Sequence, residues 1–91
     1  MHYVYVLRSI ADDGFYIGYS ANLRKRFDQH MKGSAFATSY RGPWRLIYYE
    51  AYLERDEALG RERYLKSGSG RRFIKAQLRH YLEKNPPSGT A

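Results

Sequence analysis

Residues 2–32 read HYVYVLRSIADDGFYIGYSANLRKRFDQHMK, and the pattern within this stretch decides the fold. The run from His2 to Arg8 is rich in β-branched and aromatic residues, which favour strands. The run from Phe15 to Tyr19 has the same character, and the Asp-Gly step at residues 13–14 between the two runs is a turn signal. The stretch therefore predicts a β-hairpin whose loop is longer than two residues.

A helix is predicted after the hairpin, from Ala21 to about Lys32, with Ser20 as its N-terminal cap. Apolar residues at i, i+4 and i+8 give this helix one apolar face, formed by Leu23, Phe27 and Met31. A neighbouring stripe has the same spacing and is polar, formed by Asn22, Arg26 and His30. Polar ends at the boundary of a buried face converge on one place, although an ordinary solvated helix edge would give the same pattern.

The rest of the chain predicts one more strand and two more helices. The strand covers Trp44 to Leu53, after a loop from Ser34 to Pro43. The helices cover Glu54 to Lys66 and Arg71 to about Lys84, with a break at residues 67–70. The predicted order is therefore β-β-α-β-α-α. A three-stranded antiparallel sheet flanked by helices, an α+β fold, is the simplest arrangement that buries these apolar faces.

Length and composition limit the protein to one small domain. We expect this domain to cover residues 1–84 of the 91, followed by a disordered tail over residues 85–91 that contains two Pro and one Gly. The apolar runs are only a few residues long, and no basic-then-apolar leader opens the chain, so neither a membrane span nor a secretory signal is expected. The sequence has no Cys, which excludes a disulfide framework and permits a cytoplasmic location.

The charge balance predicts a polyanionic partner, most plausibly nucleic acid. The chain has 16 Lys and Arg against 9 Asp and Glu, a net charge of +7. The alternative is a basic surface that contacts only water. In the loop before the third strand, Phe36 and Tyr40 are suited to stacking on unpaired bases. The residues predicted to contact nucleic acid are Arg24, Lys25, Tyr40, Arg41, Lys66, Arg71, Arg72 and Lys75.

Two further features bear on chemistry. Ala58, Glu62 and Leu65 follow at i, i+4 and i+7, which places a carboxylate in an apolar stripe, where a charge needs a partner or a metal. One carboxylate is what a single hard divalent ion on a phosphate diester would use, and a neighbouring cation is the alternative partner. Tyr5 and Tyr16 lie on neighbouring strands of the predicted hairpin, where cross-strand side chains meet on one face, although tyrosine is also an ordinary sheet residue.

These residues together resemble the GIY-YIG nuclease family. The segments that carry the resemblance occur in the family's order and span residues 3 to about 82. The chain looks most like the short stand-alone bacterial members, which are related to the catalytic domain of the excision-repair incision subunit. It departs from the family in three ways: the first motif lacks its Gly, Tyr19 stands where some members have Lys, and a later Asn is missing. The matching segments are Val4-Tyr5-Val6, Tyr16-Ile17-Gly18, the run Asn22 to His30 in the pattern Asn-Leu-x-x-Arg-x-x-x-His, and Arg61 to Lys66.

The resemblance implies hydrolysis of a DNA phosphodiester that depends on one Mg²⁺ or Mn²⁺ ion. By this resemblance Glu62 is the metal ligand and Arg26 holds the scissile phosphate. Tyr5 and Tyr16 are the paired tyrosines, of which one activates water, with Tyr5 favoured as the base and His30 assisting. A free phenol has a pKa near 10, so it needs nearby cations to act as a base.

We expect the protein to be a monomer that nicks single-stranded or branched DNA with little sequence specificity. We expect it to need no small-molecule cofactor. A site with one metal cuts one strand per encounter, and the sequence shows no dimerisation device. A non-catalytic nucleic-acid-binding module on the same fold is the alternative function. A third possibility is a protein-interaction domain that uses its aromatic residues.

Overall fold

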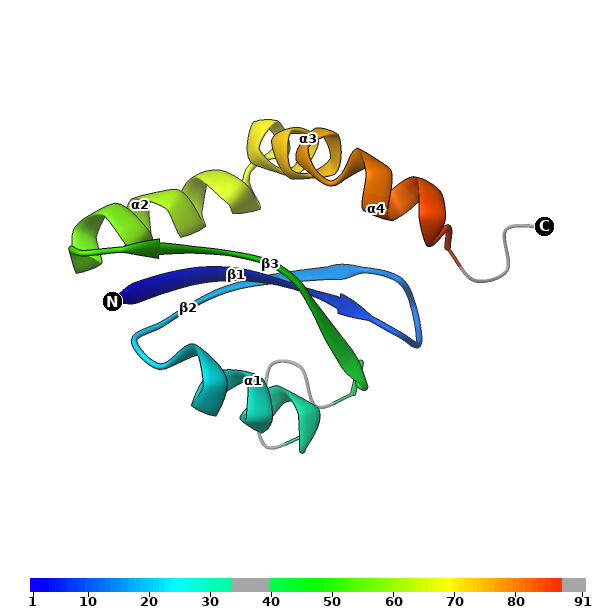
Figure 1. Cartoon of the computed structure of the whole chain (residues 1–91), viewed down its shortest axis with the longest axis horizontal. Coiled ribbons are helices and arrows are strands. Elements are labelled where there is room, and N and C mark those ends of the chain that lie inside the picture. The colour runs from blue at the N-terminus through cyan, green and yellow to red at the C-terminus, as the bar shows by residue number, and fades with distance from the viewer. Residues whose placement is uncertain (34–39, 88–91) are drawn as a thin grey trace.

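The computed structural model of the protein describes residues 1–33 and 40–87. Its centre is an antiparallel sheet of three strands, β1 (His2–Ser9), β2 (Phe15–Ser20) and β3 (Trp44–Tyr52), in the order β2-β1-β3. The first strand of the chain therefore lies in the middle of the sheet, and β2 and β3 form its edges (Figure 1). The predicted α+β class and three-stranded antiparallel sheet are confirmed.

Helices cover both faces of the sheet. The helix α1 (Leu23–Met31) lies on one face, whereas α2 (Arg55–Lys66), α3 (Gly68–Gln77) and α4 (Arg79–Lys84) lie on the opposite side (Figure 1). The element order is β-β-α-β-α-α-α, one helix more than predicted. Within residues 1–33 and 40–87, no helix has the length and apolar character needed to cross a membrane.

The alternation of side chains along β1 divides the buried residues between two cores. Val4 and Val6 pack in the core beneath α2 and α3. Tyr5 and Leu7 point to the other face, where they pack with the buried ring of Trp44 and the apolar side of α1. The two cores meet only across the sheet, so a polar site on the α1 face is separated from the larger apolar core.

The first helix starts later than predicted, because Asn22 rather than Ser20 is its cap. The side chain of Asn22 accepts a hydrogen bond from the backbone N–H of Lys25 at 3.1 Å, which satisfies one of the free N–H groups of the first turn. The Ser20 hydroxyl instead donates to the carbonyl of Asn22 at 2.9 Å and closes the turn out of β2. The helix ends at Met31, so this predicted core residue lies at a frayed end and is 45% exposed.

The predicted helix over residues 71–84 is wrong in two respects. It begins at residue 68, because the Ser67 side chain accepts from the N–H of Gly70 at 3.1 Å and caps a helix that contains the expected break. The N–H of Gly70 is therefore already paired and is not free to bind an anion at the N-terminus of this helix. The helix then stops at Leu78, whose backbone (φ −100°, ψ 22°) leaves the helical conformation before α4 begins.

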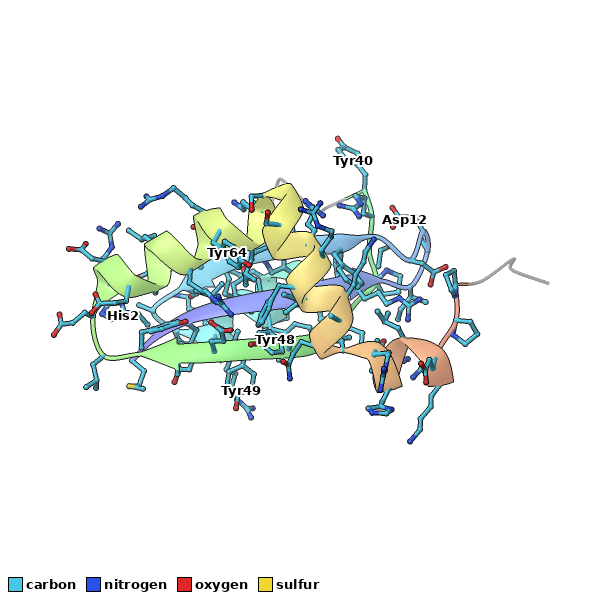
Figure 2. The ribbon with its side chains drawn as sticks, turned by 90° about the horizontal axis from the view of Figure 1, so that it is seen from above. His2, Asp12, Tyr40, Tyr48, Tyr49 and Tyr64 are labelled. Carbon is cyan, nitrogen blue, oxygen red and sulfur yellow. The ribbon has the colours of Figure 1, made fainter. Side chains whose placement is uncertain are left out.

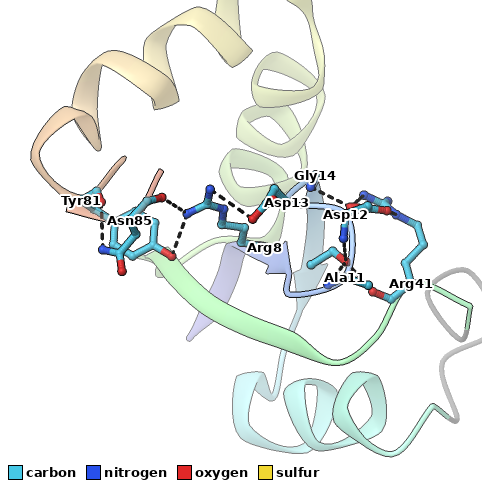
Figure 3. Close-up of polar contacts among 9 residues, drawn as sticks. Arg8, Ala11, Asp12, Asp13, Gly14, Arg41, Tyr81 and Asn85 are labelled. Atoms are coloured by element: carbon cyan, nitrogen blue, oxygen red, sulfur yellow. Dashed lines mark hydrogen bonds and ion pairs between the residues drawn. The ribbon is translucent and has the colours of Figure 1, made fainter. Parts of the chain in front are cut away.

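The bend at residue 78 lets the end of the chain reach the hairpin. Arg8, which is 6% exposed, donates to the backbone carbonyl of Asn85 at 2.7 Å and forms an ion pair with Asp13 at 3.4 Å, and its guanidinium lies over the ring of Tyr81 (Figure 3). The helices α3 and α4 are thereby tied to β1. The predicted tail over residues 85–91 stays a prediction, because residues 88–91 lie outside the described part of the chain.

Candidate active site

The Tyr5 side chain lies across the neighbouring strand β2. Tyr5 on β1 and Gly18 on β2 are direct partners in the antiparallel ladder. A Cβ atom on Gly18 would lie 2.5 Å from the Tyr5 hydroxyl oxygen and 2.6 Å from the ring carbon that bears it. The missing side chain at Gly18 is therefore what makes room for the phenol, which reaches toward the β2 edge and is 1% exposed.

Three aromatic side chains from three elements meet around this phenol. The Tyr5 hydroxyl and Nε2 of His30 on α1 lie 2.9 Å apart in a buried hydrogen bond. The ring of Tyr16 on β2 lies 5.1 Å from the His30 ring and 6.4 Å from the Tyr5 ring, centroid to centroid. His30 is 1% exposed although it is polar, so its polar atoms depend on protein partners. The structure thus brings together three of the side chains predicted for the site.

Burial keeps both hydrogen-bonded groups neutral near physiological pH. It raises the pKa of Tyr5 to about 12, an effect that the adjacent Arg26 guanidinium partly offsets and that the charge of Glu62 increases. Burial also lowers the pKa of His30 to about 4, and the positive charge of Arg26 adds to this effect. The pair Tyr5–His30 therefore carries no charge; Arg26 acts on both groups, and Glu62 acts on Tyr5 with the opposite sign.

Arg26 is the cation of the site, and its donors are only partly used. It lies on α1 one turn before His30, and its Nη1 donates to Oε1 of Gln29 at 3.0 Å. Its Nε is buried and has no hydrogen-bond partner among the described residues. A buried guanidinium donor without an acceptor favours an anionic ligand, because such a group costs free energy until it is paired.

Glu62 approaches from the opposite face of the sheet. It lies on α2 between the fully buried residues Ala58 and Leu65, and its side chain is 19% exposed. Lys66, one turn later on the same helix, pairs with its carboxylate at 3.1 Å, so the alternative partner considered from the sequence is present. Because Lys66 is half exposed, this pair is of the surface type that contributes little free energy and exchanges readily.

The donor set fits one hard divalent cation. No cluster of three or more His, Asp or Glu side chains suited to a metal occurs within residues 1–33 and 40–87. Mg²⁺ is commonly held by one or two carboxylates together with water and substrate phosphate, and Glu62 can supply one such carboxylate. Two metal ions would need more carboxylates than the described residues place here.

An ion-pair network between α2 and β3, which no local sequence pattern indicates, holds this helix against the sheet. Arg61, the residue before Glu62, forms a two-pronged pair with Glu50 on β3, with Nε and Nη2 each about 3.0 Å or less from a carboxylate oxygen. The hydroxyls of Tyr48 and Tyr52 donate to the same carboxylate. This network fixes the rotation of α2 and hence the direction of the next side chain.

The residues predicted to contact nucleic acid do not form one surface. Arg24 and Lys25 are exposed on α1, whereas Arg71, Arg72 and Lys75 are exposed on α3, on the other side of the sheet (Figure 1). One DNA strand that follows the α1 face therefore does not contact both groups at the same point along its length.

The remaining residues of that prediction differ in how available they are. Lys66 pairs with the carboxylate described above, and Arg41 pairs with Asp12 of the hairpin turn at 3.0 Å (Figure 3). Tyr40 is 92% exposed and free of such an ion pair. Phe36, predicted to stack on bases together with Tyr40, lies outside the described residues.

The site residues missed from the sequence carried weak signals. In the sequence Gly18 stands out only as part of the Tyr16-Ile17-Gly18 motif, and its role depends on the register of Tyr5 against β2. Glu50 lies in a strand of aromatic and aliphatic residues, where a single acid is as unusual as Glu62 in its helix. Its partner Arg61 is eleven positions away, and no local pattern indicates that pairing.

Comparisons with known proteins match a large part of this chain. The profile of a protein family described as the GIY-YIG catalytic domain matches residues 1–75. A UPF0213 protein of Clostridium perfringens is 42% identical over 67 residues, which cover 72% of this chain and 71% of that protein. A UPF0213 protein of Oceanobacillus iheyensis is 36% identical over 84 residues, 91% of this chain and 94% of that protein.

A solved structure has the same fold. The solution NMR structure of a UPF0213 protein from Bacillus halodurans superposes with a TM-score of 0.52 at 33% sequence identity, and the match covers 93% of this chain and 87% of that one. The matches to the Oceanobacillus iheyensis and Bacillus halodurans proteins thus extend over nearly the whole chain.

Proposed function

Because the chain belongs to the GIY-YIG catalytic domain family, we propose that it is a divalent-metal-dependent endonuclease that hydrolyses DNA phosphodiester bonds. The observation that carries this proposal is the Tyr5–His30 hydrogen bond, which is buried, neutral and influenced by one cation and one carboxylate. A module that only binds nucleic acid needs the cation but has no use for a carboxylate that repels phosphate.

In the proposed reaction Arg26 binds the scissile phosphate. Its buried Nε lacks an acceptor, and a guanidinium can donate two parallel hydrogen bonds to non-bridging phosphate oxygens. Charge that builds up on these oxygens during attack is then stabilised by a donor already in place. Glu62 would hold one Mg²⁺ or Mn²⁺ ion, which supplies further positive charge toward the phosphate and the leaving oxygen when bound.

Tyr5 and His30 together accept the proton of the attacking water. The Tyr5 hydroxyl takes this proton while it donates its own to Nε2 of His30, so no free phenolate is needed despite the raised pKa of Tyr5. The new P–O bond forms as the bond to the leaving oxygen breaks, and solvent protonates that oxygen. Burial is the main cause of the lowered pKa of His30, and pairing of the phosphate with Arg26 offsets the smaller contribution of that positive charge. After cleavage His30 releases the proton to solvent, which restores the neutral pair. Tyr16 packs against both rings and orients them.

We propose single-stranded or branched DNA as the substrate, cut by a monomer with little sequence specificity. One metal site hydrolyses one strand per encounter, so supercoiled plasmid should be converted to open circles well before linear molecules appear. Immediate conversion to linear DNA together with a dimeric mass by light scattering would contradict this. A setting in DNA repair, implied by the resemblance to the excision-repair incision subunit, is part of the same proposal.

The decisive experiment compares the wild-type chain with Glu62→Gln on single-stranded, duplex, flap and branched DNA, with Mg²⁺, with Mn²⁺ and with EDTA. We expect cleavage only with the metal and the carboxylate, and unchanged or tighter DNA binding by the variant, because a negative charge has been removed. Cleavage by Glu62→Gln at the wild-type rate would refute the assignment of Glu62 to the active site. Binding without cleavage under every condition would favour the non-catalytic module.

A further inference from the structure

A groove of about 590 Å³ lies between the first half of α1 and the strands β1 and β3. Its apolar surface is formed by Leu23 and Phe27 of α1 and by Leu46 of β3, and two tyrosines, Tyr3 and Tyr49, line it from the sheet. The volume is sufficient for a nucleotide base with part of its sugar. None of these five side chains takes part in the active site described above.

The two tyrosines present ring surface that the fold does not use. Their rings form an edge pair with centroids 6.1 Å apart and an interplanar angle of 61°. Tyr49 is 56% exposed and points outward past the edge strand β3, in contrast to Tyr48, which lies near α3 (Figure 2). A large aromatic side chain that is more than half exposed beside an apolar groove is a surface on which a planar ligand can stack.

The groove and the active site lie on the same face of the sheet, on either side of β1. Tyr49 is the direct ladder partner of Tyr5, and Gly18 is the partner of Tyr5 on the other side. Because the Tyr5 phenol leans over Gly18 toward β2, it leaves the β3 side of this face open. The groove is therefore a neighbour of the reacting centre, separated from it by the width of about one strand.

The polar rim of the groove has the charge of a phosphate-binding surface. Arg24 and Asn22 lie at the rim with Asp28, and a second depression of about 460 Å³ continues from these residues to Lys25 and Lys32. Three cations thus face one acid along this side of α1. A polyanionic strand complements this balance, whereas an acid-poor apolar peptide would leave the cations unpaired.

We propose that this groove holds an unpaired base of the DNA strand, stacked on Tyr49 and Tyr3, while Arg24 and Lys25 contact the adjacent phosphates; this inference rests on the proposed function. The base of a Watson–Crick pair is already stacked on both faces and cannot enter the groove. The groove therefore gives the enzyme its preference for single-stranded DNA through binding rather than through the chemical step.

The test measures binding separately from cleavage. Fluorescence anisotropy with a labelled single-stranded oligonucleotide and with a blunt duplex is recorded in EDTA for the wild-type chain, Tyr49→Ser, Tyr49→Phe and Arg24→Gln. Stacking of one base is worth about 1–3 kcal/mol, so Tyr49→Ser should weaken single-strand binding roughly 5- to 150-fold and leave duplex binding unchanged. Tyr49→Phe keeps the ring and should bind within about twofold of wild type.

Two controls make the outcome specific. Leu53→Ser removes an apolar side chain that is 81% exposed just beyond β3 and should leave both affinities unchanged. Arg24→Gln should lower the slope of log K against log salt by about 0.7 on single strands. Circular dichroism shows that each variant is folded. The result for Tyr49→Phe supports the proposal only if Tyr49→Ser binds single-stranded DNA more weakly than Tyr49→Phe does.

The results separate this inference from the nuclease proposal. If Tyr49→Ser binds single strands as tightly as wild type, or if both strand types lose affinity equally, the groove is not a base site, whatever the cleavage assay shows. If the predicted pattern appears but no metal supports cleavage, the groove stands and the nuclease proposal fails. A dimer that Tyr49→Ser dissolves, without an effect on DNA binding, would assign the groove to a second copy of the chain and overturn the inference.

Discussion

Gly18→Ala tests whether the glycine opposite Tyr5 makes room for the phenol. The added Cβ would lie 2.5 Å from the Tyr5 hydroxyl oxygen and 3.1 Å from a ring carbon of Tyr16. Ordinary contacts between such atoms are about 3.5 Å, so the phenol must move by about 1 Å. It has no free space to move into, because it is 1% exposed and hydrogen-bonded to His30.

The substitution should affect both stability and rate, and the two effects are measured separately. Overpacking of a buried site costs about 1–3 kcal/mol in free energy of unfolding. A displacement of about 1 Å of a catalytic group reduces the rate roughly 100-fold. Urea unfolding followed by fluorescence of the single Trp44 gives the first quantity, and single-turnover cleavage at saturating DNA and metal gives the second. The strand propensity of Ala, which exceeds that of Gly, would by itself change stability in the opposite direction.

Two comparisons decide whether the steric argument is correct. Gly60→Ala is the matched control, because the nearest atom to its new Cβ is 4.0 Å away, and it should stabilise α2 by up to about 1 kcal/mol. In a Tyr5→Leu background the two closest contacts are absent and only the 3.1 Å contact with Tyr16 remains, so Gly18→Ala should cost clearly less than in the wild-type chain. An equal cost in both backgrounds, or full cleavage activity of Gly18→Ala at unchanged stability, would refute the reasoning.

Three further predictions concern the packing and charge of the domain. Gly70→Ala should lower the free energy of unfolding by more than about 3 kcal/mol in thermal or urea unfolding, since the added Cβ would overlap the carbonyl oxygen of Tyr64. In the control Gly68→Ala the added Cβ lies 3.7 Å from its nearest neighbour, so the change should stay within about 1 kcal/mol. His30 has a folded-state pKa of about 4, so as pH falls from 7 to 4 the unfolded chain binds a proton at this residue before the folded chain does, and the free energy of unfolding should fall by up to about 3 kcal/mol. Subtracting the stability-versus-pH curve of His30→Gln should isolate this loss, and parallel curves for the two proteins would exclude it. Glu50→Gln should lower the free energy of unfolding in urea by about 1–3 kcal/mol at pH 7. Because pairing with Arg61 holds the pKa of Glu50 below its ordinary value, this difference should shrink as pH falls through the folded-state pKa, and a difference that does not change with pH would contradict the ion-pair account.

Local patterns in the sequence were sufficient for most of the fold. The hairpin, β3 and α2 follow from alternation, turn residues and apolar spacing, and their ends agree with the structure within a residue or two. The errors occur at helix ends. Ser20 and Asn22 are both good caps, and only the pairing of Ser20, the last residue of β2, with Tyr3 of β1 decides between them. The stop at Leu78 has no local signal, because the contact of Arg8 with residues near the end of the chain favours the bend.

The site was predictable where a motif was present and not where two distant segments meet. The positions of Tyr5, Tyr16, Arg26 and His30 on adjoining faces follow from strand pairing and helix periodicity. The pKa directions of Tyr5 and His30 depend on how deeply each is buried, which composition does not give.

The central position of β1 has a consequence for how the chain folds as it is made. Within this domain β1 is synthesised before the other two strands and pairs with β2 in a short hairpin, but its other edge remains unpaired until β3, which ends at residue 52, is made. Closing such a long loop is slower than local helix or hairpin formation, so the docking of β3 should limit the folding rate. Until then the nascent hairpin exposes the open edge of β1 to other chains. A circular permutant of this domain that links residue 91 to residue 1 and starts at the exposed Tyr40 would make β3 first, and should expose that edge for less of its synthesis.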